Sequence, residues 1–232
     1  PPGWFVGARE FELAELKLLV DAVQSSRFIT RRKSDALIRK LESLASVHQA
    51  RQLQRQVYVA GRVKSMNESV YYSIDKLHTA IAAQRAVSFR YFEYNVRKEK
   101  VFRREGARYT VSPYGLLWDS ENYYLARYDH AAEELRHYRV DKMAQLTLTD
   151  QPRQGDSACR NLDMASYSKK HFGMFSGREG QVVLRCKNSL VGVVLDRFGQ
   201  DAILIPDGGE HFTVTVQVVV SPQFLGWVFG LG

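Results

Sequence analysis

Alternating hydrophobic and polar residues predict a series of strands in the middle of the chain. Residues 109–117, 122–128 and 135–143 are rich in aromatic and β-branched side chains, and two short polar segments separate them. Residues 86–92 alternate in the same way and predict one strand ahead of these three. Because strands joined by short turns pair with their neighbours, the three later segments predict an antiparallel meander.

Hydrophobic residues at three- and four-residue steps predict helices on the N-terminal side of the strands. The first helix is expected over residues 9–25, and a second is expected to begin at Thr30 or Ser34 and to run to about Gln49. A third is expected over residues 67–85, after a short strand at residues 57–63. The first two helices are too short to bury their apolar stripes alone, so we expect them to pack on each other, on the next domain or on a second subunit.

A second compact pattern follows a polar segment that begins after Asp150. A short helix and turn at residues 163–174 precede it. The pattern predicts, in order, a strand at 182–186, a helix at 190–198 that ends at Gly199, strands at 202–205 and 212–220, and a helix capped by Ser221. This succession predicts an α/β unit of its own.

Composition places the chain among ordinary soluble globular proteins, since 45% of its 232 residues are hydrophobic and 25% are charged. The net charge of +8 favours polyanionic partners only weakly. The two cysteines, Cys159 and Cys186, are too few for a disulfide framework or a zinc site, which fits a reducing cytoplasm. Without a long apolar run or a signal peptide, we expect a cytoplasmic protein that does not enter a membrane.

Catalytic motifs are missing from the sequence. It contains no HExxH, Walker, GxGxxG or GxSxG segment, and its six histidines are scattered. We therefore expect a protein that is not an enzyme and that has no catalytic residue, no metal site and no cofactor.

The strand pattern instead predicts a binding surface of cations and aromatic rings. Side chains alternate across a strand, so arginines, tyrosines and a histidine of neighbouring strands can lie side by side. The candidate ligand-binding residues are Arg90, Tyr124, Arg127, Tyr128, His137 and Arg139. Such a surface suits a phosphate or carboxylate together with a base or ring. The alternative is that the tyrosines are ordinary sheet-forming residues and the cations only keep this face hydrated.

Two further basic clusters each leave two interpretations open. One cluster lies between and within the first two helices, where six cations stand against Asp35; it is either a solvated face or a surface that faces DNA. Its cations are Arg27, Arg31, Arg32, Lys33, Arg39 and Lys40. The other is the turn at residues 97–108, which holds six cations against Glu99 and Glu105. This turn is either a solvated hairpin tip or one wall of an anion site.

Three segments together resemble the WYL domain of bacterial transcriptional regulators. They are Ser112-Pro113-Tyr114, Tyr123-Tyr124-Leu125 and Tyr138-Arg139-Val140-Asp141, in this order and at these intervals. The sequence departs from the family at Tyr123, where tryptophan is usual, and at Arg127, where a small residue is usual. The first change keeps an aromatic ring, whereas the added cation would change which ligand the pocket prefers.

The resemblance implies an α+β protein with N-terminal helices, a small Sm/SH3-like antiparallel barrel and a C-terminal ferredoxin-like extension. It divides the chain into a helical linker and possible dimerisation region at 1–85, a WYL domain at 86–150, a linker at 151–178 and a WYL C-terminal extension at 179–232. It also implies a winged helix-turn-helix domain before residue 1, and a further strand and helix after residue 232. Absence of that strand would expose a sheet edge.

The leading functional hypothesis is a sensor that binds a small anion, a nucleotide or single-stranded nucleic acid on the basic and aromatic surface. Binding would change how a homodimer contacts DNA through the expected winged-helix domain. One alternative is a constitutive nucleic-acid-binding module, and another is a dimerisation scaffold that binds no ligand. A ligand-dependent change in the dimer arrangement separates the first hypothesis from the other two.

Overall fold

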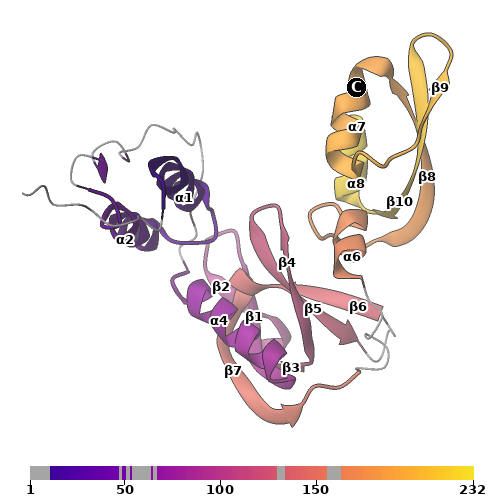
Figure 1. Cartoon of the computed structure of the whole chain (residues 1–232). Helices are drawn as coiled ribbons and strands as arrows, with labels where there is room; N and C mark the ends of the chain where they lie inside the picture. The colour runs from indigo at the N-terminus through magenta and orange to yellow at the C-terminus, as the bar shows by residue number, and fades with distance from the viewer. Residues whose placement is uncertain are drawn as a thin grey trace, which may run out of the picture. The chain divides into compact units, whose positions relative to one another are not determined.

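The chain has an α+β fold with two compact units, one built from the described residues up to Gln154 and one from Gly155 onward (Figure 1). The computed structural model describes residues 11–46, 49–50, 53, 64, 67–129, 134–155 and 163–232. The expected strand at 57–63 lies outside these residues. The α+β class is confirmed, while the finer division into four parts stays a prediction.

The helices and strands of the two units are as follows. The first unit contains α1 (Leu13–Ser25), α2 (Arg31–Glu42), α4 (Ser69–Ala82), β1 (Arg85–Tyr94), β2 (Lys100–Phe102), the 3₁₀ turn η1 (Arg103–Gly106), β3 (Tyr109–Val111), β4 (Pro113–Asp119), β5 (Asn122–Asp129), β6 (Glu134–Arg139), the 3₁₀ turn η2 (Val140–Lys142) and β7 (Met143–Pro152). The second contains α6 (Met164–Lys170), β8 (Arg178–Lys187), the 3₁₀ turn η3 (Asn188–Leu190), α7 (Val191–Phe198), β9 (Leu204–Asp207), β10 (His211–Val220) and α8 (Pro222–Phe229).

Helices α1 and α2 pack against each other, which is one of the three expected arrangements. The hydroxyl of Thr30 accepts a hydrogen bond from the backbone N–H of Lys33, so Thr30 is the cap of α2. The second expected helix is shorter than predicted, because α2 ends at Glu42. The third expected helix, α4, begins and ends within three residues of its predicted limits.

The strands of the first unit form two antiparallel sheets. One has the order β2-β1-β3 with β7 also paired to β1, and the other has the order β4-β5-β6, which is the expected meander. The segment expected as one strand at 109–117 is divided between the sheets, since β3 pairs with β1 and β4 pairs with β5. Pro113 stands at this division, where its missing N–H interrupts a continuous ladder.

The last strand of the meander is also shorter than expected. Strand β6 ends at Arg139, the turn η2 follows, and the chain then returns as β7 along β1. Strand β7 was not predicted as a separate strand. Strand β7 starts at Met143, where the expected strand at 135–143 was to end. The pattern of residues did not predict the turn at 140–142 that separates β6 from β7.

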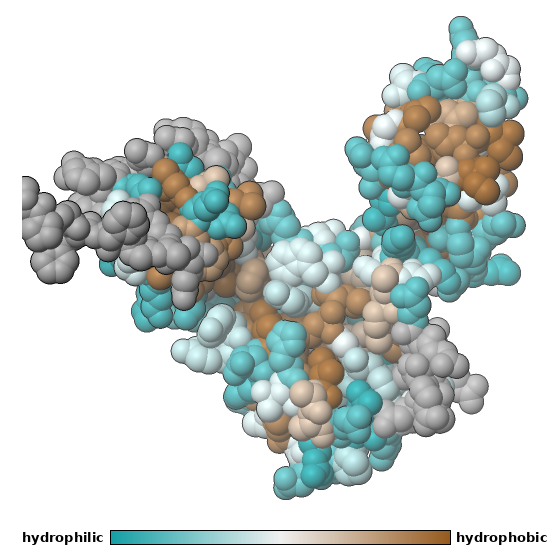
Figure 2. Space-filling view, viewed as in Figure 1, coloured by the Kyte–Doolittle hydropathy of each residue, from teal (hydrophilic) through white to brown (hydrophobic). Residues whose placement is uncertain are grey.

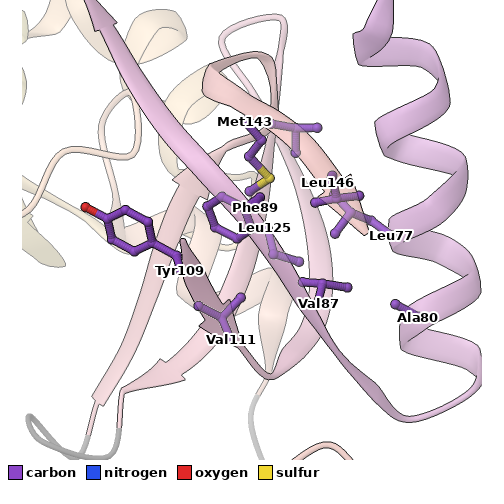
Figure 3. Close-up of a cluster of buried hydrophobic side chains, with 10 residues drawn as sticks. Leu77, Ala80, Val87, Phe89, Tyr109, Val111, Leu125, Met143 and Leu146 are labelled. Carbon is purple, nitrogen blue, oxygen red and sulfur yellow. The ribbon is translucent and has the colours of Figure 1, made fainter. Parts of the chain in front are cut away.

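One hydrophobic core joins both sheets to α4 (Figure 3). It contains Leu77 and Ala80 of α4, Val87 and Phe89 of β1, Tyr109 and Val111 of β3, Leu125 of β5, Val140 of η2, and Met143 and Leu146 of β7. Neither sheet closes into a barrel in the strand pairing of the described residues, so the expected Sm-like barrel is not confirmed. The shared core nevertheless fixes the two sheets against each other and positions the side chains described below.

The second unit is a three-stranded antiparallel sheet of order β8-β10-β9, with α7 and α8 contributing to its core. Gly199 has a φ of 105° directly after α7, and the hydroxyl of Ser221 accepts a hydrogen bond from the N–H of Phe224 at the start of α8. Both predicted helix boundaries are therefore confirmed. Among the described strands, β8 pairs with β10 alone, and the expected ferredoxin-like fold is not confirmed.

The second unit carries hydrophobic residues on its surface, seen as brown atoms in Figure 2. The most exposed of them are Phe229, Ile203 and Val183, which retain 81%, 77% and 65% of their accessible surface. No helix within the described ranges is both long and apolar enough to cross a membrane.

Candidate functional site

Four arginines and two tyrosines of the first unit surround a single cavity of about 460 Å³. We call it the arginine cavity, and its lining residues are Arg103, Arg104, Tyr109, Arg127, Arg136 and Tyr138. They come from η1, β3, β5 and β6, so the cavity lies where the two sheets meet. Four arginines in the lining of one cavity make this part of the surface strongly positive.

The floor of the arginine cavity is a cluster of packed aromatic rings. Phe89 and Tyr109 are stacked with ring centroids 5.8 Å apart, and Tyr138 meets Phe89 edge-on at 5.4 Å. Tyr91 lies 5.0 Å from Tyr138. Such aromatic pairs add about 0.5–1.5 kcal/mol each beyond the burial of their area. The floor is thus built from the core itself and holds its rings in place.

Three of the arginines lie over rings of this floor. The guanidinium carbon of Arg104 is 4.6 Å from the ring centroid of Tyr109, and that of Arg127 is 5.2 Å from Tyr138. Arg103 lies 5.8 Å from the ring of Tyr91. At these distances each cation is attracted to the face of its ring. The rings therefore hold three of the guanidinium groups beside the cavity.

The turn η1 has a backbone conformation that is uncommon outside glycine. Arg104, Glu105 and Gly106 have φ values of 51°, 53° and 82°, so three successive residues are left-handed. For the two non-glycine residues this costs about 1–2 kcal/mol each. Because the chain reverses so tightly, two consecutive arginines reach the same cavity. The Nη2 of Arg103 also lies 2.9 Å from a carboxylate oxygen of Glu93, in an exposed ion pair.

Arg127 and Arg136 are direct cross-strand partners in the β5–β6 ladder. Side chains at such positions point to the same face of the sheet, and like charges directly opposite each other destabilise it. The pairing therefore places two positively charged side chains side by side on this face of the β5–β6 ladder.

The structure does not form the single surface that we predicted from the sequence. Arg139 is the cross-strand partner of Tyr124, whereas Arg127 is the partner of Arg136. Because alternate residues face opposite sides of a sheet, Arg127 and Arg139 lie on opposite faces. The guanidinium of Arg139 binds both carboxylate oxygens of Asp141, at 3.0 and 2.8 Å, and the side-chain oxygen of Asn122 at 2.9 Å.

Three more predicted residues share the face of Arg139. Tyr124 is only 5% exposed and meets the ring of His137 edge-on at 5.7 Å. Burial raises the pKa of Tyr124. Tyr128 follows on the same face of β5 by alternation. Of the six predicted residues, Arg127 alone lines the arginine cavity.

Arg90 is likewise separate from the cavity. It lies one residue from the core residue Phe89 on β1, and therefore on the other face of that strand. Its guanidinium carbon is 5.9 Å from the ring centroid of Phe102. Its Nε is buried and has no hydrogen-bond partner among the described residues. Arg90 therefore packs against the β1–β2 hairpin.

Part of the arginine cavity was predicted from a different segment of the sequence, the basic turn at residues 97–108. Arg103 and Arg104 belong to the basic turn that was considered as a wall of an anion site, and they line the cavity. Arg136, Tyr138 and Tyr109 were missed. Arg136 and Tyr138 are two residues apart on one strand, and this spacing places them on one face. The register that brings Arg127 to the same face depends on the β5–β6 connection, which the pattern of residues does not specify.

Tyr91 links the cavity floor to the Arg139 side of the sheet. Its hydroxyl accepts a hydrogen bond of 3.3 Å from the backbone N–H of Arg139. Burial raises the pKa of Tyr91 to about 12, so the phenol remains neutral at physiological pH. The described part of the chain contains no cluster of side chains that could hold a metal ion. The groups that the arginine cavity offers to a ligand are positively charged arginines and aromatic rings.

Comparison with known proteins places a family model on this part of the chain. The model of the WYL domain matches residues 73–148. None of the curated proteins matches the chain. Among solved structures, the chain is similar to proteasome accessory factor B/C (PafBC) of Arthrobacter aurescens, with 18% sequence identity and a TM-score of 0.33. This similarity covers 89% of the present chain and 30% of the other.

The match to the family model runs from α4 to β7 and includes every residue that lines the arginine cavity. Residues 73–148 of this chain therefore form a WYL domain.

Proposed function

We propose that this chain is the sensory region of a cytoplasmic transcriptional regulator and that its arginine cavity binds a nucleotide or a short stretch of single-stranded nucleic acid. The observation that supports this proposal is a cavity lined by four arginines and two tyrosines within a WYL domain. Binding without chemical turnover is the expected activity.

The chemistry of the cavity suits a phosphate group that is attached to a flat ring. Arginine binds phosphate through two parallel N–H···O bonds, which a single ammonium group cannot do. The exposed face of a guanidinium also stacks on a base, and such stacking tolerates any base. The ion pair between Arg103 and Glu93 is exposed on both sides, so an incoming phosphate can displace the carboxylate at little cost.

The regulatory step requires that ligand binding at the cavity changes another part of the protein. Tyr138 lines the cavity, and the next residue, Arg139, is bound to Asp141. The carbonyl oxygen of Asp141 accepts a hydrogen bond of 3.2 Å from Asn67, which precedes α4. This short series of bonded residues supports a route from the cavity to the helices. We propose that it biases a homodimer between two arrangements of its DNA-binding domains, by the difference in ligand affinity between them.

The proposal predicts that binding of oligo(dT) is sensitive to salt and to one arginine. Arg136→Gln should lower the slope of log K against log salt by about 0.7, the value expected for one lost phosphate contact to a single strand. Affinity should fall about tenfold, as for one charge-assisted hydrogen bond. Fluorescence anisotropy of labelled oligo(dT) at several salt concentrations measures both quantities.

The matched control is Arg178→Gln, which removes the same charge from an exposed position in the second unit. Its slope and affinity should stay close to those of the unaltered chain. Equal losses in the two variants would show that binding depends on net charge and not on the cavity. X-ray scattering with and without oligo(dT) then separates a sensor from a constitutive binder, since only a sensor changes its arrangement.

A further inference from the structure

A second cavity lies in the first unit, between the start of α2 and the start of α4. It has a volume of about 220 Å³, and we call it the helix pocket. Its lining residues are Phe28, Ile29, Thr30, Arg32, Lys33, Ala36, Asn67, Glu68, Tyr71 and Tyr72. None of them lines the arginine cavity. The two cavities are therefore lined by different residues.

One side of the helix pocket is aromatic. Tyr71 and Tyr72 meet at 5.4 Å, and they keep 45% and 63% of their surface exposed. Phe28 is held in place by edge contacts of 5.2 Å to both Trp118 and Tyr123. Two exposed tyrosines in succession on a helix leave ring surface that a flat ligand can cover.

The other side of the helix pocket is cationic. Lys33 holds its ammonium group 4.2 Å from the ring centroid of Tyr71, and Arg32 extends from the preceding position. The carboxylate of Glu68 faces both the hydroxyl of Thr30, at 3.5 Å, and the Nε of Arg32, at 3.7 Å. These contacts are long and the two charged side chains are exposed, so the carboxylate is held weakly.

Glu68 therefore marks a position that accommodates a carboxylate beside aromatic rings. A ligand that brings its own carboxylate and its own ring would satisfy both sides of the pocket at once. At about 30 Å³ for each water molecule, the volume corresponds to about seven waters, which suits a single-ring compound and is small for a nucleotide. We propose that the helix pocket binds a small aromatic carboxylic acid, whose carboxylate takes the place of Glu68 beside Arg32 and Lys33.

Binding of benzoate to the full chain tests this proposal. Calorimetric titration should show saturable binding of benzoate, while benzamide, which has the ring without the charge, and acetate, which has the charge without the ring, should each bind at least about tenfold more weakly. Glu68→Gln should strengthen benzoate binding about fivefold, because the competing negative charge is removed. Tyr72→Ala should weaken it about fivefold through the loss of ring contact.

Both substitutions are at exposed positions, so the fold should be retained. The opposite signs of their effects distinguish a site from a general loss of structure. Absence of saturable binding up to about 10 mM in both the unaltered chain and Glu68→Gln would overturn the proposal, as would Glu68→Gln weakening the binding. Arg136→Gln should leave benzoate binding unchanged, so failure of the proposed function and failure of this site give different results.

Discussion

Replacement of both Arg104 and Arg136 by glutamate is expected to reduce the affinity for oligo(dT) by at least about 100-fold. Each charge-assisted hydrogen bond to phosphate contributes about 1.5–3 kcal/mol, and 1.4 kcal/mol corresponds to a tenfold change in affinity. The double change takes the formal charge of the four cavity arginines from +4 to 0. A phosphate would then meet two carboxylates at the positions where it now meets two guanidinium groups. Fluorescence anisotropy with labelled oligo(dT) measures the loss.

The double variant should remain folded, because both side chains are exposed. Its near-ultraviolet circular dichroism should therefore match that of the unaltered chain, and its melting temperature should be no lower, because Arg136→Glu replaces a like-charge pair with Arg127 by an opposite-charge pair. Arg97→Glu combined with Arg178→Glu makes the same change in net charge at exposed positions outside the cavity and should reduce affinity far less. If the cavity variant binds oligo(dT) within about threefold of the unaltered chain, the arginine cavity is not the binding site.

Phe89→Ala is expected to lower the free energy of unfolding of the first unit by about 3–5 kcal/mol. Phe89 is fully buried in the core that joins both sheets (Figure 3). Its ring is stacked on Tyr109 and meets Tyr138 edge-on. Removing it deletes buried apolar area and leaves a void beneath the arginine cavity. Urea unfolding followed by circular dichroism measures the change in stability.

Phe89→Leu is the matched variant, since it keeps most of the buried volume while removing the aromatic contacts. Phe89→Leu should lower the free energy of unfolding markedly less than Phe89→Ala does. It should still weaken oligo(dT) binding, because Tyr109 and Tyr138 lose the ring that orients them. A cost of less than about 1 kcal/mol for Phe89→Ala would mean that this residue is not central to the core.

Much of the fold could be predicted because local patterns determine it. The cap at Thr30, the helix end at Gly199 and the cap at Ser221 all follow from hydrogen bonds and backbone angles within a few residues of each position. The division of the expected strand at Ser112 could not be predicted in the same way. A run of β-forming residues looks continuous, and the exchange of one sheet for another at Pro113 is a property of tertiary packing.

The binding surface was harder to predict because it depends on strand register. The residues of each strand were assigned correctly to alternating faces, but the faces of different strands could not be matched. Pairing of Arg127 with Arg136 places Arg139 on the far side, where Asp141 and Asn122 hold it. The sequence indicates the left-handed backbone of η1 only through Gly106, and it indicates the cavity lining by Arg103 and Arg104 only through their charge.

The most direct test of the arginine cavity is the NMR signal of each arginine Nε–H during titration with oligo(dT), assigned with single Arg→Lys variants. The structure predicts that the signals of the four cavity arginines shift together and saturate at one ligand concentration, namely those of Arg103, Arg104, Arg127 and Arg136. The signals of Arg90 and Arg139 should stay in place, because these side chains lie outside the cavity. A saturating shift at Arg139 with no shift at Arg104 or Arg136 would contradict the account.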